Sequence, residues 1–117
     1  NRDRLAQEEI FGPVITITGY SDEAEAIALA NDTEFGLAGT VWSQDHDRAR
    51  DIGRALRTGS VGINHYQLDI QSPFGGVKSS GIGRELGPEG LQAYRVSKAM
   101  YCCDDQRTAV PDSIGPR

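Results

Sequence analysis

Residues 14–64 have the sequence VITITGYSDEAEAIALANDTEFGLAGTVWSQDHDRARDIGRALRTGSVGIN, in which short apolar segments alternate with segments of helical periodicity. The apolar segments are bounded by turn residues and predict three strands, over residues 14–20, 37–43 and 60–64. The segments between them, 23–30 and 45–57, predict helices. The order strand–helix–strand–helix–strand is typical of an α/β layer, so we expect a partial parallel sheet with right-handed crossovers.

The first predicted helix has a clear start signal. Asp22 is a favourable N-cap residue, and Glu25 three positions later completes a capping box. The helical spacing of the following residues predicts one shared face, formed by Ala24, Ile27, Ala28 and Asn31.

The second predicted helix, 45–57, carries the strongest helical pattern in the chain. Spacings of three and four residues place one buried stripe on it, formed by Ala49, Ile52, Gly53 and Leu56. Gly59 follows the helix at a position where a left-handed C-terminal residue is favourable. We interpret the basic stripe of this helix as a solvated face paired with nearby acids, with Arg50, Arg54 and Arg57 beside Asp47 and Asp51.

The remaining residues are less regular. Residues 65–84 are rich in glycine and lack periodicity, which is typical of a functional loop. A short helix is expected from Pro88 to Tyr94, followed by a last strand over residues 96–103. Residues 104–117 contain two prolines and no periodic pattern, so they predict a mobile tail.

Three strands and two helices cannot cover both faces of a parallel sheet. We therefore expect the layer to belong to a larger sheet whose other strands lie upstream in a longer polypeptide. The N-terminus agrees with this expectation, because Asn-Arg-Asp-Arg provides neither an initiator methionine nor an apolar signal segment.

Composition argues against several classes of protein. The 117 residues carry 12 basic and 17 acidic side chains, a net charge of −5, which disfavours nucleic-acid binding. No apolar run approaches the ~18 residues of a membrane span. Cys102 and Cys103 are adjacent and suggest no disulfide framework, so we predict a cytoplasmic protein. Neither His46 nor His65 has a second ligand at a suitable spacing, so no metal site is predicted.

The glycine-rich stretch 73–87 invites comparison with two phosphate-binding loops and fits neither. A Walker A loop requires glycine immediately before its lysine, whereas Val77 precedes Lys78. A dinucleotide-binding fingerprint requires a third glycine where Leu86 stands, together with a strand immediately before the loop.

Three segments in this order resemble the C-terminal part of the NAD(P)-dependent aldehyde dehydrogenases: EEIFGPV at 8–14, ANDTEFGL at 30–37 and PFGGVKSSGIGRELG at 73–87. The resemblance covers residues 7–101. It implies a parent enzyme that oxidises an aldehyde to a carboxylic acid with NAD or NADP, through a cysteine thioester. It also implies that residues 1–94 belong to the catalytic domain. Residues 95–103 would then form a strand that joins subunits into a homodimer or homotetramer.

The resemblance also assigns roles to individual residues. Glu9 is expected to hold the ribose hydroxyls of the nicotinamide, since a carboxylate accepts hydrogen bonds from a vicinal diol, and Phe11 to pack beside the ring. Phe74 is expected to line the aldehyde channel. Asn64 falls near that channel, although a role in capping the end of a strand suits it at least as well. Glu85 matches a glutamate proposed to relay protons, and a helix-start acid favoured by the helix dipole is an equal alternative.

The cysteine nucleophile and the glutamate base of this family precede the EEIFGPV motif and are absent from this sequence, so we expect the chain to be inactive alone. Cys102 and Cys103 follow the motif, and we interpret them as small apolar strand residues or exposed thiols. A second hypothesis is a non-catalytic association module that binds longer subunits through its last strand. The reading frame upstream of Asn1 distinguishes the two, because the enzyme requires a cysteine motif and a cofactor-binding motif there.

Overall fold

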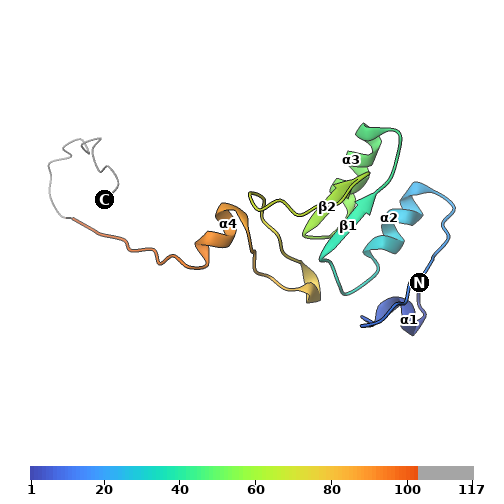
Figure 1. Cartoon of the computed structure of the whole chain (residues 1–117), viewed down its shortest axis with the longest axis horizontal. Coiled ribbons are helices and arrows are strands. Elements are labelled where there is room, and N and C mark those ends of the chain that lie inside the picture. The colour runs from blue at the N-terminus through green and yellow to red at the C-terminus, as the bar shows by residue number, and fades with distance from the viewer. Residues whose placement is uncertain (103–117) are drawn as a thin grey trace.

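The computed structural model describes residues 1–102, in which a small α/β unit is followed by a long loop and a short helix (Figure 1). The regular elements are α1 (Arg4–Gln7), α2 (Glu23–Asn31), β1 (Ala38–Val41), α3 (His46–Ala55), β2 (Ser60–Ile63), the 3₁₀ turn η1 (Lys78–Ser80) and α4 (Gly87–Gln92). Strands β1 and β2 run parallel, with Ala38 opposite Ser60 and Val41 opposite Ile63. The α/β class and the parallel sheet are therefore confirmed.

Helix α3 connects the two strands and packs against both of them. The Asp45 carboxylate caps its first turn by accepting a hydrogen bond from the Arg48 amide at 3.0 Å. Ala49 is fully buried, and a Cβ added to Gly53 would lie 3.3 Å from Val61, so helix and strand approach closely. The predicted stripe is confirmed, because its other members are half-buried: Ile52, Gly53 and Leu56.

The opposite side of α3 carries ion pairs, as its charge pattern predicts. Arg50 pairs with Asp47 at 2.7 Å, and Arg54 pairs with Asp51 at 2.6 Å, each across three residues. All four side chains are more than half exposed. The interpretation of this stripe as a solvated face is confirmed for these two pairs, and such exposed pairs add little to stability.

Helix α2 begins where the capping box predicts. The Asp22 carboxylate accepts a hydrogen bond from the Glu25 amide at 2.8 Å. The Glu25 carboxylate accepts one from the Ser21 amide at 2.6 Å, so the reciprocal bond goes to the residue before the N-cap. Two donors that the helix itself cannot satisfy are thereby paired.

The apolar face predicted on α2 is right for two of its four members and wrong for the other two. Ile27 and Asn31 are half-buried, whereas Ala24 and Ala28 are exposed. The reason is the rotation of the helix, which turns its Ala26 and Ile27 side toward a groove beside β1 and α3.

The strand predicted over residues 14–20 is wrong, since the sheet has two strands within residues 1–102. This segment has no neighbouring strand, and Ile15 and Ile17 are 89% and 94% exposed. β-branched composition is a local property, whereas a strand requires a hydrogen-bonded partner. The described residues supply no such partner.

The C-terminal elements are confirmed in part. Helix α4 forms where a short helix is predicted, with Pro88 in its first turn. The strand predicted over residues 96–103 is not formed within 96–102, where the chain is exposed and runs away from the α/β unit (Figure 1). The cause is again a missing neighbour. Cys103 and the tail predicted over 104–117 lie outside the described residues.

Gly59 has a different role from the predicted one. Helix α3 ends on Leu56 with extended backbone, φ −76°, so it does not end on a left-handed residue. Gly59 itself does not adopt a left-handed conformation. A Cβ added to Gly59 would instead overlap the carbonyl oxygen of Gly75. The glycine is required because the start of β2 and the glycine-rich loop pack main chain against main chain.

Candidate functional site

The segment 31–36 begins at the last residue of α2 and accepts contacts from three other parts of the chain. We call it the carbonyl turn. The Lys78 ammonium donates hydrogen bonds to the main-chain oxygens of Asn31 and Thr33, both at 2.9 Å. These two bonds hold η1 on the carbonyl turn. They are strong for hydrogen bonds, because their donor is charged.

The glycine-rich loop also binds the carbonyl turn through Gly36. The Gly36 amide donates to the Ser80 hydroxyl at 3.0 Å, and its carbonyl accepts from the amides of Val77 at 2.9 Å and Gly59 at 3.0 Å. Gly36 is buried, and a Cβ there would lie 2.6 Å from the Arg57 carbonyl oxygen. Any side chain at this position would therefore separate the loop from the α/β unit.

The N-terminal arm is anchored on the same turn. The Gln7 side-chain amide donates to the Asp32 carbonyl at 3.0 Å. The Asn1 side-chain amide donates to the carbonyls of Leu29 at 3.1 Å and Asp32 at 3.0 Å. Because Glu9 lies two residues after Gln7, the structure brings all three motif segments to one place.

A cavity of about 550 Å³ lies where these segments meet. Glu9 is the only acidic residue in its lining and is exposed at its rim. Phe11, the second predicted cofactor residue, is 96% exposed and does not line the cavity. Apolar side chains share the lining with four residues that carry hydroxyl groups: Thr33, Thr58, Ser79 and Ser80. A carboxylate among hydroxyls is a chemical environment suited to a sugar diol.

Phe74 and Glu85 pair through their main chains. Each amide donates to the other carbonyl at 2.7 Å, so the loop predicted over residues 65–84 contains an antiparallel bridge in addition to η1. Phe74 is half-buried and lines a cavity of about 310 Å³ together with Tyr66 and Leu68. Glu85 is exposed and lies two residues before α4, a position compatible with both of its predicted roles.

Asn64 holds the end of β1 to the end of β2. Its side-chain amide nitrogen donates to the Ser43 carbonyl at 2.7 Å, and its amide oxygen accepts from the Ser43 amide at 2.8 Å. Asn64 also has a left-handed backbone, φ 55°, which asparagine adopts more readily than most residues. These bonds support the strand-end role, and the channel role stays a prediction.

Asn64→Ala is expected to lower the free energy of unfolding by about 1–3 kcal/mol, since it removes both bonds and leaves the Ser43 main chain unpaired. Asn64→Gly should be less destabilising than Asn64→Ala, because glycine adopts φ 55° without strain. Thermal denaturation of the three proteins measures the order. Equal melting temperatures for the alanine variant and the unaltered protein would contradict the bonding described for Asn64.

Two structural absences apply to the described part of the chain. Within residues 1–102, no group of three or more histidine, cysteine, aspartate or glutamate side chains is placed to hold a metal ion. No helix in that range combines the length and the apolar character that crossing a bilayer requires.

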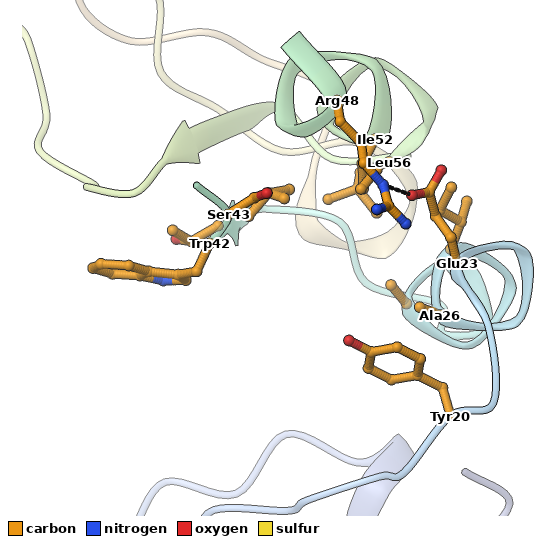
Figure 2. Close-up of a pocket in the computed structure, with 12 residues that line it drawn as sticks. Tyr20, Glu23, Ala26, Trp42, Ser43, Arg48, Ile52 and Leu56 are labelled. Atoms are coloured by element: carbon orange, nitrogen blue, oxygen red, sulfur yellow. Dashed lines mark hydrogen bonds and ion pairs between the residues drawn. The ribbon is translucent and has the colours of Figure 1, made fainter. Parts of the chain in front are cut away.

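A third hollow, of about 520 Å³, lies between α2, α3 and β1 (Figure 2). Arg48 reaches across it from α3 to Glu23 on α2, with Nε and Oε2 2.5 Å apart. By accepting this hydrogen bond, and by its charge, the Glu23 carboxylate raises the pKa of Arg48 above its ordinary value. Tyr20 and Trp42 border the hollow and are 65% and 73% exposed, so this side of the α/β unit is uncovered within residues 1–102.

Two residues that hold distant segments of the chain together give little signal in the sequence. Lys78 stands in a glycine-rich stretch that fits no phosphate-binding loop, and nothing in its spacing indicates that its ammonium binds two carbonyls. The Asn31 side chain donates to the Ala55 carbonyl at 2.9 Å and accepts from the Arg57 amide at 2.7 Å. The sequence offers one cue for these two bonds: an asparagine at the end of a helix, whose side chain can both donate and accept a hydrogen bond.

The fold and the convergent motifs define a family. The model described as "Aldehyde dehydrogenase family" matches residues 1–100, and the chain therefore belongs to the aldehyde dehydrogenase family. Geranial dehydrogenase of Castellaniella defragrans is 60% identical over 101 residues, which are 86% of this chain and 21% of that protein. Betaine aldehyde dehydrogenase of Bacillus subtilis is 50% identical over 99 residues, 84% of this chain and 20% of that protein.

Solved structures agree with this membership. An aldehyde dehydrogenase of Mycobacterium tuberculosis complexed with NAD⁺ is similar with a TM-score of 0.76 and 55% identity, over 78% of this chain and 19% of that one. Betaine aldehyde dehydrogenase of Staphylococcus aureus in complex with NAD⁺ is similar with a TM-score of 0.78 and 53% identity, over 81% of this chain and 19% of that one. The chain thus spans about a fifth of the length of these relatives.

Proposed function

We propose that the chain is the C-terminal part of a longer enzyme that oxidises an aldehyde to a carboxylic acid with NAD⁺ or NADP⁺, through a cysteine thioester. The observation that carries the proposal is the place of Glu9 at the rim of the cavity where the three motif segments meet. Family membership over residues 1–100 and the NAD⁺ complexes of two similar structures support it. The nucleophile and the base are expected in the upstream part of the polypeptide.

The cavity lining suits the ribose of a nicotinamide cofactor. Glu9 supplies a carboxylate that can accept two hydrogen bonds from vicinal hydroxyls, and Ser79 and Ser80 add hydroxyl groups. The bound cofactor supplies the ring that takes up hydride from the substrate. By holding the ribose, Glu9 orients that ring, which matters because the reacting atoms must lie about 3–3.5 Å apart. Phe11 is proposed to pack beside the ring.

The substrate side is assigned to the second half of the chain. Phe74 is proposed to line the aldehyde channel, because it is half-buried in a largely apolar hollow. Asn64, which holds Ser43, would fix the end of β2 at the edge of that channel. Glu85 is proposed to relay protons from the site to solvent, since it is exposed and its main chain is paired with that of Phe74.

Assembly is proposed to use the segment after α4. Residues 95–102 have no strand partner within the described chain, and Val96, Met100 and Tyr101 are 97%, 83% and 94% exposed. An extended segment with unpaired main-chain groups adds readily to the edge of a neighbouring sheet. We propose that it does so in a homodimer or homotetramer. The cytoplasmic location expected from the sequence stays a prediction.

The complete polypeptide is expected to reduce NAD⁺ or NADP⁺ when it is supplied with an aldehyde, while the 117-residue chain alone produces no reduced cofactor. The measurement is cofactor reduction monitored by absorbance. The aldehydes tested should include geranial and betaine aldehyde, the compounds that name two relatives.

Each outcome of this assay separates the hypotheses. No turnover by the complete polypeptide with any aldehyde would refute the proposed enzyme. Turnover by the 117-residue chain alone would refute the claim that its nucleophile lies upstream. Co-purification of the short chain with a longer subunit, without turnover by either, would instead favour the association module.

A further inference from the structure

We propose that Lys78 is a positioning residue of the nicotinamide site, which holds the glycine-rich loop on the carbonyl turn and thereby holds the cavity wall formed by Ser79 and Ser80. The inference rests on the proposed function. Lys78 does not line the cavity, so it acts through the residues that it holds.

The geometry at the ammonium group supports this role. Nζ donates to Asn31 and Thr33 at 2.9 Å, and both bonds are partly buried. They join residues 47 and 45 positions apart in the chain. The same turn receives the Ser79 amide, which donates to the Glu34 carbonyl at 2.9 Å. Lys78 therefore provides a charged link between two segments that the sequence separates widely.

The main chain at Lys78 indicates that its side chain matters. Lys78 has φ 55°, a left-handed conformation that is uncommon for a residue with a side chain. Glycine adopts this conformation without strain, and the surrounding loop is rich in glycine. A requirement for the backbone alone would be met better by glycine. The strain at this position is instead accompanied by two charge-assisted bonds.

The link reaches Glu9 through the carbonyl turn. Lys78 binds the carbonyls of Asn31 and Thr33, and Gln7 binds the carbonyl of Asp32 between them. The loop and the arm that carries Glu9 are therefore fastened to three successive main-chain oxygens. Loss of the Lys78 bonds should loosen the turn, and with it both walls of the ribose site. Cofactor affinity should fall more than aldehyde affinity.

The test replaces Lys78 in the complete polypeptide and uses two readouts. In the absence of cofactor, Lys78→Met should speed hydrogen–deuterium exchange of residues 31–36 by at least about tenfold, because it removes both charged hydrogen bonds, and leave α3 unchanged. Titration with NAD⁺, without aldehyde, should show about tenfold weaker binding. Lys78→Arg keeps a charged donor, so its exchange rate and NAD⁺ affinity should stay close to those of the unaltered protein. Lys78→Gly should resemble Lys78→Met in both measurements.

The control is Arg54→Met, which removes an exposed cation on α3 and should change neither readout. If Lys78→Gly had the exchange rate and the NAD⁺ affinity of the unaltered protein, the proposal would be overturned, because only the backbone conformation at this position would matter. Faster exchange with unchanged NAD⁺ affinity would also overturn it, since Lys78 would then be merely structural. If Lys78→Met does not fold, the comparison of Lys78→Arg with Lys78→Gly decides. Failure of the unaltered protein to bind NAD⁺ refutes the proposed function separately.

Discussion

Glu9→Gln is expected to slow hydride transfer in the complete enzyme by about 100-fold, the penalty that follows when a reacting group is displaced by about 1 Å. Glutamine keeps the size of the side chain and one acceptor oxygen, but it loses the charge that strengthens both bonds to a ribose diol. The ring would then sample orientations in which hydride transfer is slow. Glu9 lines the cavity where the three motif segments meet and does not line the hollow beside Phe74, so aldehyde binding should change little.

Single-turnover measurements of reduced cofactor, with ordinary and deuterated aldehyde, test this directly. A larger isotope effect in Glu9→Gln would show that hydride transfer has become rate-limiting. Glu8→Gln is the matched control, because the neighbouring carboxylate does not line the cavity and pairs with Arg4 at 2.7 Å on the surface. An unchanged single-turnover rate in Glu9→Gln would remove Glu9 from the proposed cofactor site.

Elements that depend on neighbouring residues in the sequence were predictable. The N-cap of α2 depends on Asp22, whose partner Glu25 lies three residues away. The buried stripe of α3 follows from one helical period. The motif segments were also identifiable, which placed Glu9 and Phe74 at candidate sites before their surroundings were known. Local physical chemistry accounts for the cap and the stripe, whereas the motif segments were identified by their resemblance to a family and the roles of Glu9 and Phe74 stay predictions.

Contacts between distant residues were not predictable in the same way. The segment 14–20 has the composition of a strand, but pairing depends on a partner that the described residues do not provide. The Lys78 bonds cross more than forty positions, so neither periodicity nor spacing reveals them. The predicted burial of Ala24 and Ala28 on α2 was wrong because the face that a helix buries depends on the neighbour it packs against. These are tertiary effects that local propensity does not encode.

The second large effect is expected at Gly59. Gly59→Ala should destabilise the complete protein by at least about 3 kcal/mol, the upper range for adding a side-chain atom where no space exists. The added Cβ would overlap the Gly75 carbonyl oxygen, and a main-chain atom cannot move aside as the end of a flexible side chain can. The Gly59 amide also donates to Gly36 at 3.0 Å, so separation of the segments would break that bond.

Gly83→Ala, in the glycine-rich loop that Gly59 contacts, is the control, since no atom lies within 4 Å of the Cβ it would add and Gly83 is not left-handed. Soluble yield and the midpoint of thermal denaturation should fall sharply in Gly59→Ala and remain near their original values in Gly83→Ala. If both variants denatured at the same temperature, the close packing of β2 against the glycine-rich loop would be wrong. Gly59→Ala should also weaken NAD⁺ binding. The added Cβ would displace the main chain of the glycine-rich loop, which carries Ser79 and Ser80 in the cavity wall.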